Sequence, residues 1–209
     1  MLTLYYSPGA CSLVAHIALE ELDTPYNTAR VVLADREHDR PEFKAINPRS
    51  RVPVLVDGDF VLTENIAILA YIGRLHPAAP LFAFDDAKTH GRMTEFLSFA
   101  ASSVHIAFAQ YWRMERFVED ESLFPAIQSS GRTNLERYFT EIEALIEGRP
   151  FIAGERYTAA DAYLLTFYRW GTRIGFGMKD YPSWSDHTER LLARPAVQRV
   201  FADEQITIG

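Results

Sequence analysis

The spacing of apolar and polar positions divides the chain into two parts that meet near residue 80. In the first part, four short apolar runs have the length and composition of β-strands, and stretches with helical spacing lie between and after them. The expected strands are 2–6, 28–33, 52–56 and 60–62, and the expected helices are 10–22, 41–46 and one that opens at 63–65 and ends before Pro77.

Two connections in this first part predict the topology of its sheet. Asp57-Gly58, between the third and fourth runs, is a strong signal for a β-hairpin. A helical crossover between the first two strands makes that pair parallel and right-handed. We therefore expect a small mixed sheet with helices packed on it.

The second part contains no convincing strand. After the segment from His76 to Pro80, apolar residues recur only at helical spacing. Thr158 and Asp161 form a capping-box pattern at the start of one helix. The expected helices are one or two within 86–118, followed by 126–147, 158–173, 183–193 and 195–203.

These patterns predict two domains. A mixed α/β domain occupies residues 1–77, an all-helical domain occupies 86–209, and residues 78–85 link them. The chain has 209 residues, of which 48% are hydrophobic and 23% charged, as in ordinary globular proteins. We find no repeat and no low-complexity segment.

The charge balance excludes some classes of partner and compartment. A net charge of -7 argues against a nucleic-acid-binding protein and against docking on anionic lipid. No window approaches the ~20 apolar residues of a membrane-spanning helix, and the first residues lack the basic start of a signal peptide. We expect a cytoplasmic protein that binds neither nucleic acid nor membrane.

The single cysteine, Cys11, is the first candidate for chemistry. One cysteine excludes an intramolecular disulfide and a cysteine-based zinc site. Cys11 follows a Pro-Gly turn and falls in the first turn of the expected helix, where free N–H groups and the helix dipole lower a thiol pKa. A lone cysteine is as often a small buried apolar residue, so both interpretations stay open. Any thiol chemistry here needs an external thiol.

Two further segments are candidates for binding. Val52-Pro53 heads an expected strand, where a cis proline leaves the preceding backbone free, although base rates favour trans. Thr63-Glu64-Asn65 opens a helix; such residues usually only cap it, but they can also hold a carboxylate at the helix N-terminus.

Ser98, Ser102 and His105 lie at positions i, i+4 and i+7, so on a regular helix they share one face. That polar stripe either faces solvent, which is the more common case, or lines a polar pocket. The acidic residues and histidine of segment 35–39 are typical of a solvated loop rather than a metal site, and we expect no metal.

Taken in this order, the features resemble a cytosolic glutathione transferase, in particular one of the bacterial beta class. The resemblance spans essentially the whole chain. The matching segments are YYSPGACS at 5–12 for the opening of the class, Asn47-Pro48 with Val52-Pro53-Val54-Leu55 for the cis-proline segment, residues 63–68 for the γ-glutamyl-binding turn, His105 for the histidine near the glutathione sulfur, and 151–161 for the segment that folds the helical domain.

The resemblance implies an N-terminal thioredoxin-like domain, an all-helical C-terminal domain, and a homodimer with its site between the domains. Cys11, Ser102 and His105 would surround the glutathione sulfur as catalytic residues. An apolar acceptor pocket would use Phe108, Tyr111, Trp112 and Tyr168. The glutathione-binding residues that it implies are Ala10, Cys11, Val52, Pro53, Glu64, Asn65, Ser98, Ser102 and His105.

Three positions depart from the family pattern. The family often has serine where Asn65 lies, and beta-class enzymes often have asparagine at the position of Ser98 and lysine at that of Ile106. Asparagine still donates a hydrogen bond, whereas isoleucine removes a cation.

The implied reaction is conjugation of reduced glutathione, as co-substrate, to a small hydrophobic electrophile. Two alternatives remain. One is glutathione-dependent thiol–disulfide exchange through Cys11. The other is a non-catalytic protein that binds hydrophobic ligands or partners on the same fold, since fold does not imply function.

Overall fold

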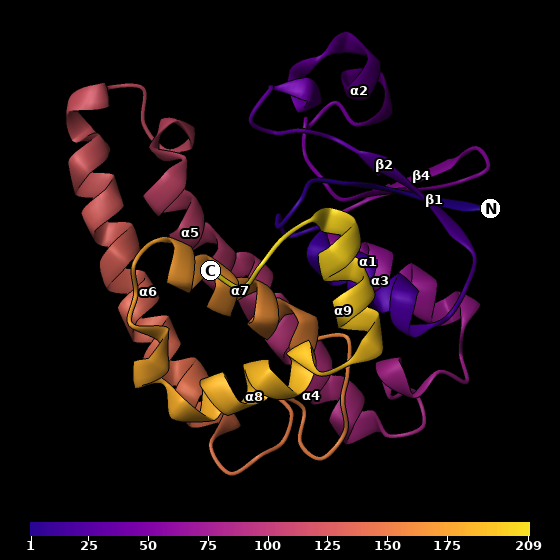
Figure 1. The fold of residues 1–209 in the computed structure, drawn as a ribbon. Helices are drawn as coiled ribbons and strands as arrows, with labels where there is room; N and C mark the ends of the chain where they lie inside the picture. Colours follow the sequence, from indigo (N-terminus) through magenta and orange to yellow (C-terminus); the bar gives the residue numbers. More distant parts are fainter.

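The computed structural model describes all residues from Met1 to Gly209 (Figure 1). The first part is a four-stranded sheet with helices packed on it, as the apolar pattern predicts. Its elements are β1 (Leu2–Tyr6), α1 (Leu13–Glu21), β2 (Tyr26–Arg30), α2 (Pro41–Ile46), β3 (Val54–Asp57), β4 (Phe60–Thr63) and α3 (Asn65–Leu75).

The sheet has the strand order β2-β1-β3-β4 and the expected mixed pairing. β1 and β2 are parallel, while β3 is antiparallel to both β1 and β4. Asp57 pairs with Phe60 across the hairpin, which confirms the turn predicted from Asp57-Gly58. Residues 28–33 were expected as the second strand, but β2 ends at Arg30, because β1 ends at Tyr6 and offers no pairing partner further on.

The second part is entirely helical apart from one isolated bridge between Phe151 and Gly154. Residues 86–118, expected as one or two helices, form α4 and α5 joined by a π-helical turn, and α5 ends at Trp112. The elements are α4 (Ala87–Phe99), the π-helical turn (Ala100–Val104), α5 (His105–Trp112), α6 (Phe124–Ile146), α7 (Asp161–Arg173), α8 (Pro182–Leu192) and α9 (Pro195–Glu204). None of these helices, nor those of the first part, has the length and apolarity to cross a bilayer.

Helix α7 is the centre of the molecule, because every residue from Asp161 to Gly171 is buried. The Asp161 carboxylate accepts hydrogen bonds from the Thr158 N–H at 2.8 Å and the Ile152 N–H at 2.9 Å, and it lies 2.8 Å from His187 Nε2. The bond from the Thr158 N–H to Asp161 is one half of the predicted capping box, while the Asp161 N–H donates to the Thr158 carbonyl rather than to its hydroxyl. The contact with His187 ties α7 to α8.

The segment 78–85, expected as a linker, is packed against its surroundings. Its short 3-10 turn buries Leu81 and Phe82, and the Leu81 carbonyl accepts a hydrogen bond from the Ala159 N–H at 3.0 Å. The Phe82 carbonyl accepts from His90 Nδ1 at 2.8 Å. The connection between the two parts is therefore held by two donors of the second part, one in the turn before α7 and one in α4.

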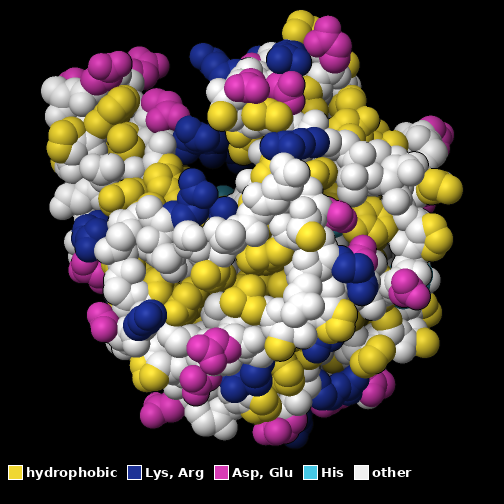
Figure 2. Space-filling view, in the orientation of Figure 1, with side chains coloured by type: hydrophobic (Ala, Val, Ile, Leu, Met, Phe, Trp, Pro, Cys, Tyr) yellow, Lys and Arg dark blue, Asp and Glu magenta, His cyan; other side chains and the backbone are white.

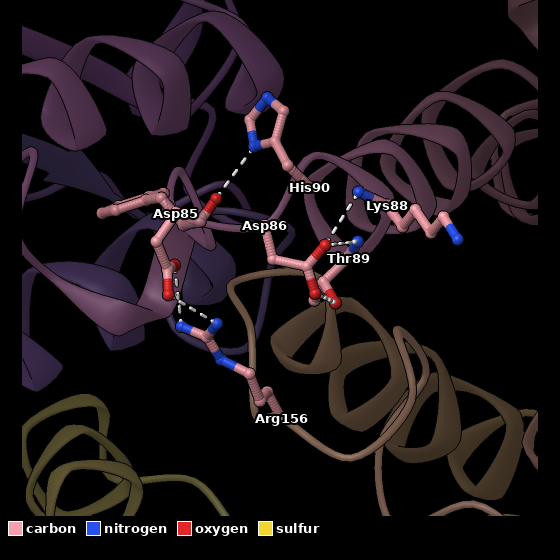
Figure 3. Close-up of polar contacts among 7 residues, drawn as sticks. Asp85, Asp86, Lys88, Thr89, His90 and Arg156 are labelled. Carbon is pink, nitrogen blue, oxygen red and sulfur yellow. Dashed lines mark hydrogen bonds and ion pairs between the residues drawn. The ribbon is translucent and has the colours of Figure 1, made fainter.

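The start of α4 is fixed by two neighbouring carboxylates (Figure 3). Asp85 forms a bidentate pair with Arg156, with N···O distances of 2.9 and 3.0 Å. Asp86 caps the helix by accepting from the N–H groups of Lys88 and Thr89. The charges are exposed, so these contacts define geometry more than stability.

Helix α9 lies against α1, and the C-terminal residues after it return to α7 (Figure 1). All residues from Leu13 to Leu19 of α1 are buried, since this helix packs against α3, α7 and α9. The last helix of the chain thus supports the first, and the turn that leads into α1 lies where the two domains meet.

Candidate functional site

A single large cavity of about 1060 Å³ opens between the two domains (Figure 2). One wall consists of the turn at residues 7–11, the segment before β3 and the start of α3. The other wall consists of α5, the residues that follow it, and one side of α7. Seven of the nine residues expected to bind glutathione line this cavity: Ala10, Cys11, Val52, Pro53, Glu64, Asn65 and His105.

The sequence pattern predicted Cys11 in the first turn of a helix. In the structure it lies instead in the turn before α1. The helix begins at Leu13, and the preceding residues form tight turns closed by hydrogen bonds such as Leu13 N–H to Ala10 carbonyl. Its sulfur lies 3.5 Å from the Val52 carbonyl, toward which the thiol donates. The partly buried Cys11 side chain therefore contacts the backbone just before β3.

The expected lowering of the Cys11 pKa is wrong. Burial, and after it the negative charge of Glu64, raises the pKa of this thiol to about 12. Nearby N–H groups and Arg116 oppose this shift without overcoming it, because desolvation of a thiolate is the larger effect. This pKa keeps Cys11 as a protonated thiol near neutral pH, in which form it can donate a hydrogen bond.

Hydrogen bonds to the backbone of Gly9 hold the turn that contains Cys11 in place. Gly9 has a φ of 66°, and a side chain there would overlap the guanidinium of Arg169. The Gly9 carbonyl accepts hydrogen bonds from Trp170 Nε1 at 2.8 Å and from Arg169 Nη1 at 3.3 Å. Both donors belong to α7, so the helical domain fixes the position of the turn that carries Cys11.

The other side of Gly9 is held by the last residue of α9. The Gly9 N–H donates to Glu204 Oε2 at 2.7 Å, and Glu204 Oε1 lies 2.8 Å from His16 Nδ1. Glu204 is 1% exposed and His16 is 0% exposed. Neither residue was a candidate from the sequence. One sequence signal could have found Glu204: at helical spacing it falls on the same face as the apolar residues Val197 and Val200.

The Val52–Pro53 peptide bond is cis. The base rate had favoured trans, and only the family resemblance predicted cis. No backbone hydrogen bond uses the Val52 N–H or carbonyl, although Val54 just beyond is paired in β3. The Val52 N–H is therefore without a partner beside the cavity, and the Val52 carbonyl accepts only from the Cys11 thiol.

Glu64 and Asn65 form the start of α3 on the same wall. Glu64 has a φ of 72°, a left-handed conformation that is uncommon for a non-glycine residue and clusters at functional sites. The buried Asn65 amide donates to the Cys11 carbonyl at 2.9 Å and to the Tyr163 hydroxyl at 3.0 Å. Asn65 thereby connects the Cys11 turn to α3 and α7, and Glu64 stays exposed at the rim.

His105 opens α5 and faces the Cys11 wall across the cavity. Its ring packs edge-on against Trp170, with centroids 5.2 Å apart. Burial, and after it the positive charges of Arg116 and Arg51, lowers the pKa of His105 to about 4. The imidazole is therefore neutral near pH 7, with one nitrogen free to donate and the other to accept.

Ser98 and Ser102 do not line the cavity with His105. Both are exposed, and their hydroxyls donate to the Thr94 and Ser98 carbonyls of their own helix. The spacing alone had favoured a solvent-facing stripe, and only the family resemblance assigned these serines to the site. A π-helical turn at residues 100–104 also interrupts the regular spacing between Ser98 and His105. Within one chain, the expected catalytic group thus reduces to Cys11 and His105.

The expected acceptor pocket is also only partly present. Trp112 lines the cavity, but Phe108 is fully buried in the helical core and Tyr111 and Tyr168 lie outside the lining. The Tyr168 hydroxyl is instead 2.9 Å from Ser185 Oγ. Helical spacing alone could not distinguish the residues of α5 that face the core from those that face the cavity.

Sequence reasoning also missed the charge of the cavity. Its lining contains one carboxylate, that of Glu64. The arginines that line it are Arg30, Arg51, Arg113, Arg116, Arg169 and Arg173.

Two family models match this chain. Residues 1–74 match the model described as glutathione S-transferase, N-terminal domain, and residues 105–195 match that of the glutathione S-transferase, C-terminal domain. Among curated proteins, glutathione S-transferase GST-4.5 of Xanthomonas campestris pv. campestris is 30% identical over 201 residues, which cover 96% of this chain and 98% of the relative.

Solved structures agree with this match. A glutathione transferase homologue from Sulfitobacter, crystallised with bound glutathione, superposes with a TM-score of 0.93 at 31% identity and covers 99% of both chains. A bacterial beta class enzyme from Sphingomonas chungbukensis superposes with a TM-score of 0.85 at 30% identity, covering 98% of this chain and all of the other.

Proposed function

Since this chain belongs to the glutathione S-transferase family and is a glutathione transferase, we propose that its reaction takes place in the cavity around Cys11. Its thioredoxin-like α/β domain followed by an all-helical domain is the fold class expected from the sequence. The observation that carries the proposal is the gathering of seven expected glutathione-binding residues around one cavity.

Glutathione lies along the wall formed by the N-terminal domain. The main-chain N–H and carbonyl of Val52 pair with its cysteinyl part, and the Cys11 thiol turns from the Val52 carbonyl to the glutathione sulfur. Its γ-glutamyl end carries one ammonium and one carboxylate, which match the Glu64 carboxylate and the N–H groups at the start of α3. The sulfur then lies between Cys11 and His105.

The reaction is a nucleophilic substitution or addition by the glutathione sulfur. A free thiol is only a few per cent ionised at neutral pH, so the enzyme gains most by stabilising the thiolate. Protonated Cys11 donates a hydrogen bond to that thiolate, and neutral His105 accepts or donates beside it. In a substitution the C–S bond forms at the electrophile, the leaving group departs with its bonding electrons, and the thiol proton goes to water. In an addition the C–S bond forms as the π bond of the electrophile breaks, and the atom that receives its electrons takes up a proton from water.

Thiol–disulfide exchange through Cys11 is the second candidate. It is supported by the position of the only thiol at the cavity, and opposed by the raised pKa, since the thiolate is the attacking species. A Cys11→Ala variant separates the two activities: disulfide reduction is lost, while conjugation of an aromatic halide falls by about tenfold or less. Equal loss of both would contradict this separation of roles.

Glutathione binding to the reduced protein is the direct test of the proposal. Isothermal titration calorimetry at neutral pH should give one site per chain with a dissociation constant between micromolar and millimolar. Glu64→Gln should weaken binding by about tenfold, since a single charged hydrogen bond contributes about 1.4 kcal/mol. Glu95→Gln, at an exposed glutamate on α4, is the matched control.

Absence of binding would contradict the proposal and favour the non-catalytic alternative. Assembly as a homodimer, as in the family, is part of the proposal and is measured by sedimentation equilibrium. The cytoplasmic location stays a prediction.

A further inference from the structure

The charge of the cavity is opposite to that of the molecule. The protein has a net charge of -7, yet six arginines and a single carboxylate line the cavity. Figure 2 shows Lys and Arg side chains on both sides of the hollow, between the two domains. A concave site lined by one sign of charge raises the local concentration of ligands of the opposite sign.

These arginines have no carboxylate partners within the protein. None of the six forms an ion pair, whereas eight other lysine and arginine side chains do. Arg169 alone is engaged, through hydrogen bonds to the Gly9 and Thr207 carbonyls. Partial desolvation and, after it, the positive charges of Arg51 and Arg113 lower the pKa of Arg116, although its side chain reaches solvent. These cations therefore repel one another around the cavity.

Three of the free arginines belong to the wall of the helical domain. Arg113 and Arg116 follow α5, and Arg173 ends α7. Apolar side chains alternate with them in the lining, including Trp112 and Phe117. This wall therefore combines guanidinium groups with aromatic faces.

Glutathione does not neutralise this wall. It has two carboxylates and one ammonium, and the proposed orientation places the γ-glutamyl end at Glu64 on the opposite wall. The remaining glycyl carboxylate, on the same side as Val52, is within the domain that carries Arg30 and Arg51. The positive charge of Arg113, Arg116 and Arg173 is then left for the second substrate.

We propose that the electrophile accepted by this enzyme is an organic acid, with a carboxylate or other oxyanion on an aromatic or similarly apolar skeleton. The anionic group contacts Arg113 and Arg116, and the skeleton packs on Trp112 and Phe117. This inference rests on the proposed function, and it narrows the small hydrophobic electrophile implied by the family resemblance to one that carries an anionic group.

A matched pair of substrates tests the inference. The acid is 4-chloro-3,5-dinitrobenzoate and the neutral counterpart is its methyl ester. In both, the glutathione sulfur forms a C–S bond at the ring carbon, the C–Cl bond breaks, chloride leaves with the bonding electrons, and the thiol proton goes to water. Each kcat/KM is divided by the uncatalysed second-order rate constant, which removes the difference in intrinsic reactivity.

We expect the normalised kcat/KM to be about tenfold higher for the acid than for the ester, and this ratio to fall as salt is raised to 1 M. Arg113→Gln and Arg116→Gln should each lower the ratio about threefold, and the double variant about tenfold, as for exposed charge pairs that act together. Lysine at both positions should restore most of the ratio. Arg149→Gln is the control, since Arg149 is exposed, outside the cavity and in no ion pair.

An equal or higher value for the ester, or a ratio that stays within twofold in the double variant, would overturn this inference while leaving the proposed function intact. Binding of the two purified conjugates, measured by calorimetry, gives the same comparison without turnover. Failure of the protein to bind glutathione would instead contradict the proposed function, and this inference with it.

Discussion

The floor of the cavity and its rim use charged residues in opposite ways. Beneath the Cys11 turn, Glu204, His16 and Arg169 are buried, and each is hydrogen-bonded to another part of the chain. At the rim, Arg51 and Arg116 are exposed and lack any carboxylate within ion-pair distance. Of the first three residues, which we call the floor, only Arg169 lines the cavity, and Glu204 and His16 lie behind it and support the Cys11 turn.

The cost of burial explains this difference. A buried polar group that lacks its partner costs about 1–3 kcal/mol, and an unpaired buried charge costs more, so charges in the floor must be bonded in the folded protein. An exposed guanidinium stays hydrated and costs little. The floor is therefore suited to hold the turn rigidly, and the rim is suited to meet a charged ligand.

The largest expected effect comes from removing the carboxylate of the floor. Glu204→Ala takes the acceptor from the Gly9 N–H and from His16, and we expect the free energy of unfolding to fall by about 3–5 kcal/mol. Urea denaturation followed by circular dichroism measures this loss. Asp203→Ala, at the exposed neighbour on α9, should change it by less than about 0.5 kcal/mol. If Glu204→Ala lowered the free energy of unfolding by less than about 1 kcal/mol, the buried carboxylate of the floor would be no more important for stability than the exposed charges of the rim.

The second prediction concerns His105, which lies where the two regions meet. Its pKa is about 4 in the folded protein against 6.5 for an unperturbed histidine, so between these values only the unfolded state binds the proton. The free energy of unfolding should therefore fall as pH drops from about 6.5 to 4, by up to about 3 kcal/mol from this group.

Comparison of the wild type with His105→Gln at several pH values isolates this contribution, because glutamine cannot take the proton. The two proteins should differ in the slope of unfolding free energy against pH below about 6.5, and run parallel above it. Parallel curves throughout the range would show that His105 is not held neutral by burial and by the arginines of the rim.

The fold follows from local pattern wherever an element depends on its own residues. The β3–β4 hairpin, the crossover between β1 and β2, and the bond from the Thr158 N–H to Asp161 in the capping box were all predicted. The exceptions depend on distant partners: β2 ends where β1 stops offering hydrogen bonds, and the π-helical turn at 100–104 has no distinctive sequence pattern.

The site was predicted mainly through the family resemblance, and less through the residues alone. The pattern around Cys11 suggested a lowered pKa, because it showed the turn but not the burial that raises it. Glu204 is 195 residues from Gly9, so no spacing rule connects them. Ser98 and Ser102 were assigned to the site by the resemblance alone, although their spacing favoured the solvent-facing position that they take.

The third prediction tests whether the rigid floor leaves Cys11 chemically inert. With a pKa of about 12, the thiol should react with iodoacetamide at pH 7 at least about a hundredfold more slowly than a free thiol, and faster as pH rises. Because Cys11 is the only cysteine, mass spectrometry of the whole protein follows the reaction directly. Denaturation in urea should restore the free-thiol rate. A native rate within threefold of the free thiol would favour the lowered pKa that the sequence pattern had suggested.

The last prediction has the smallest expected effect. It compares how substitution of two arginines of the same cavity, one in the floor and one at the rim, changes the free energy of unfolding. Arg169 is 5% exposed and donates to the Gly9 and Thr207 carbonyls, so Arg169→Gln should lower the free energy of unfolding by about 2 kcal/mol. Arg116 is exposed and repelled by Arg51 and Arg113, so Arg116→Gln should leave it within about 0.5 kcal/mol or raise it slightly.

Both values come from the same urea titration as the Glu204 series, and moderate salt gives a further check. Salt screens the repulsion among exposed cations, so any gain in stability from Arg116→Gln should shrink as ionic strength rises, while the loss from Arg169→Gln should not. Equal losses from the two substitutions would mean that Arg116 is a structural residue like Arg169. A stable Arg116→Gln protein would instead show that the fold does not need this charge, which leaves it available for binding.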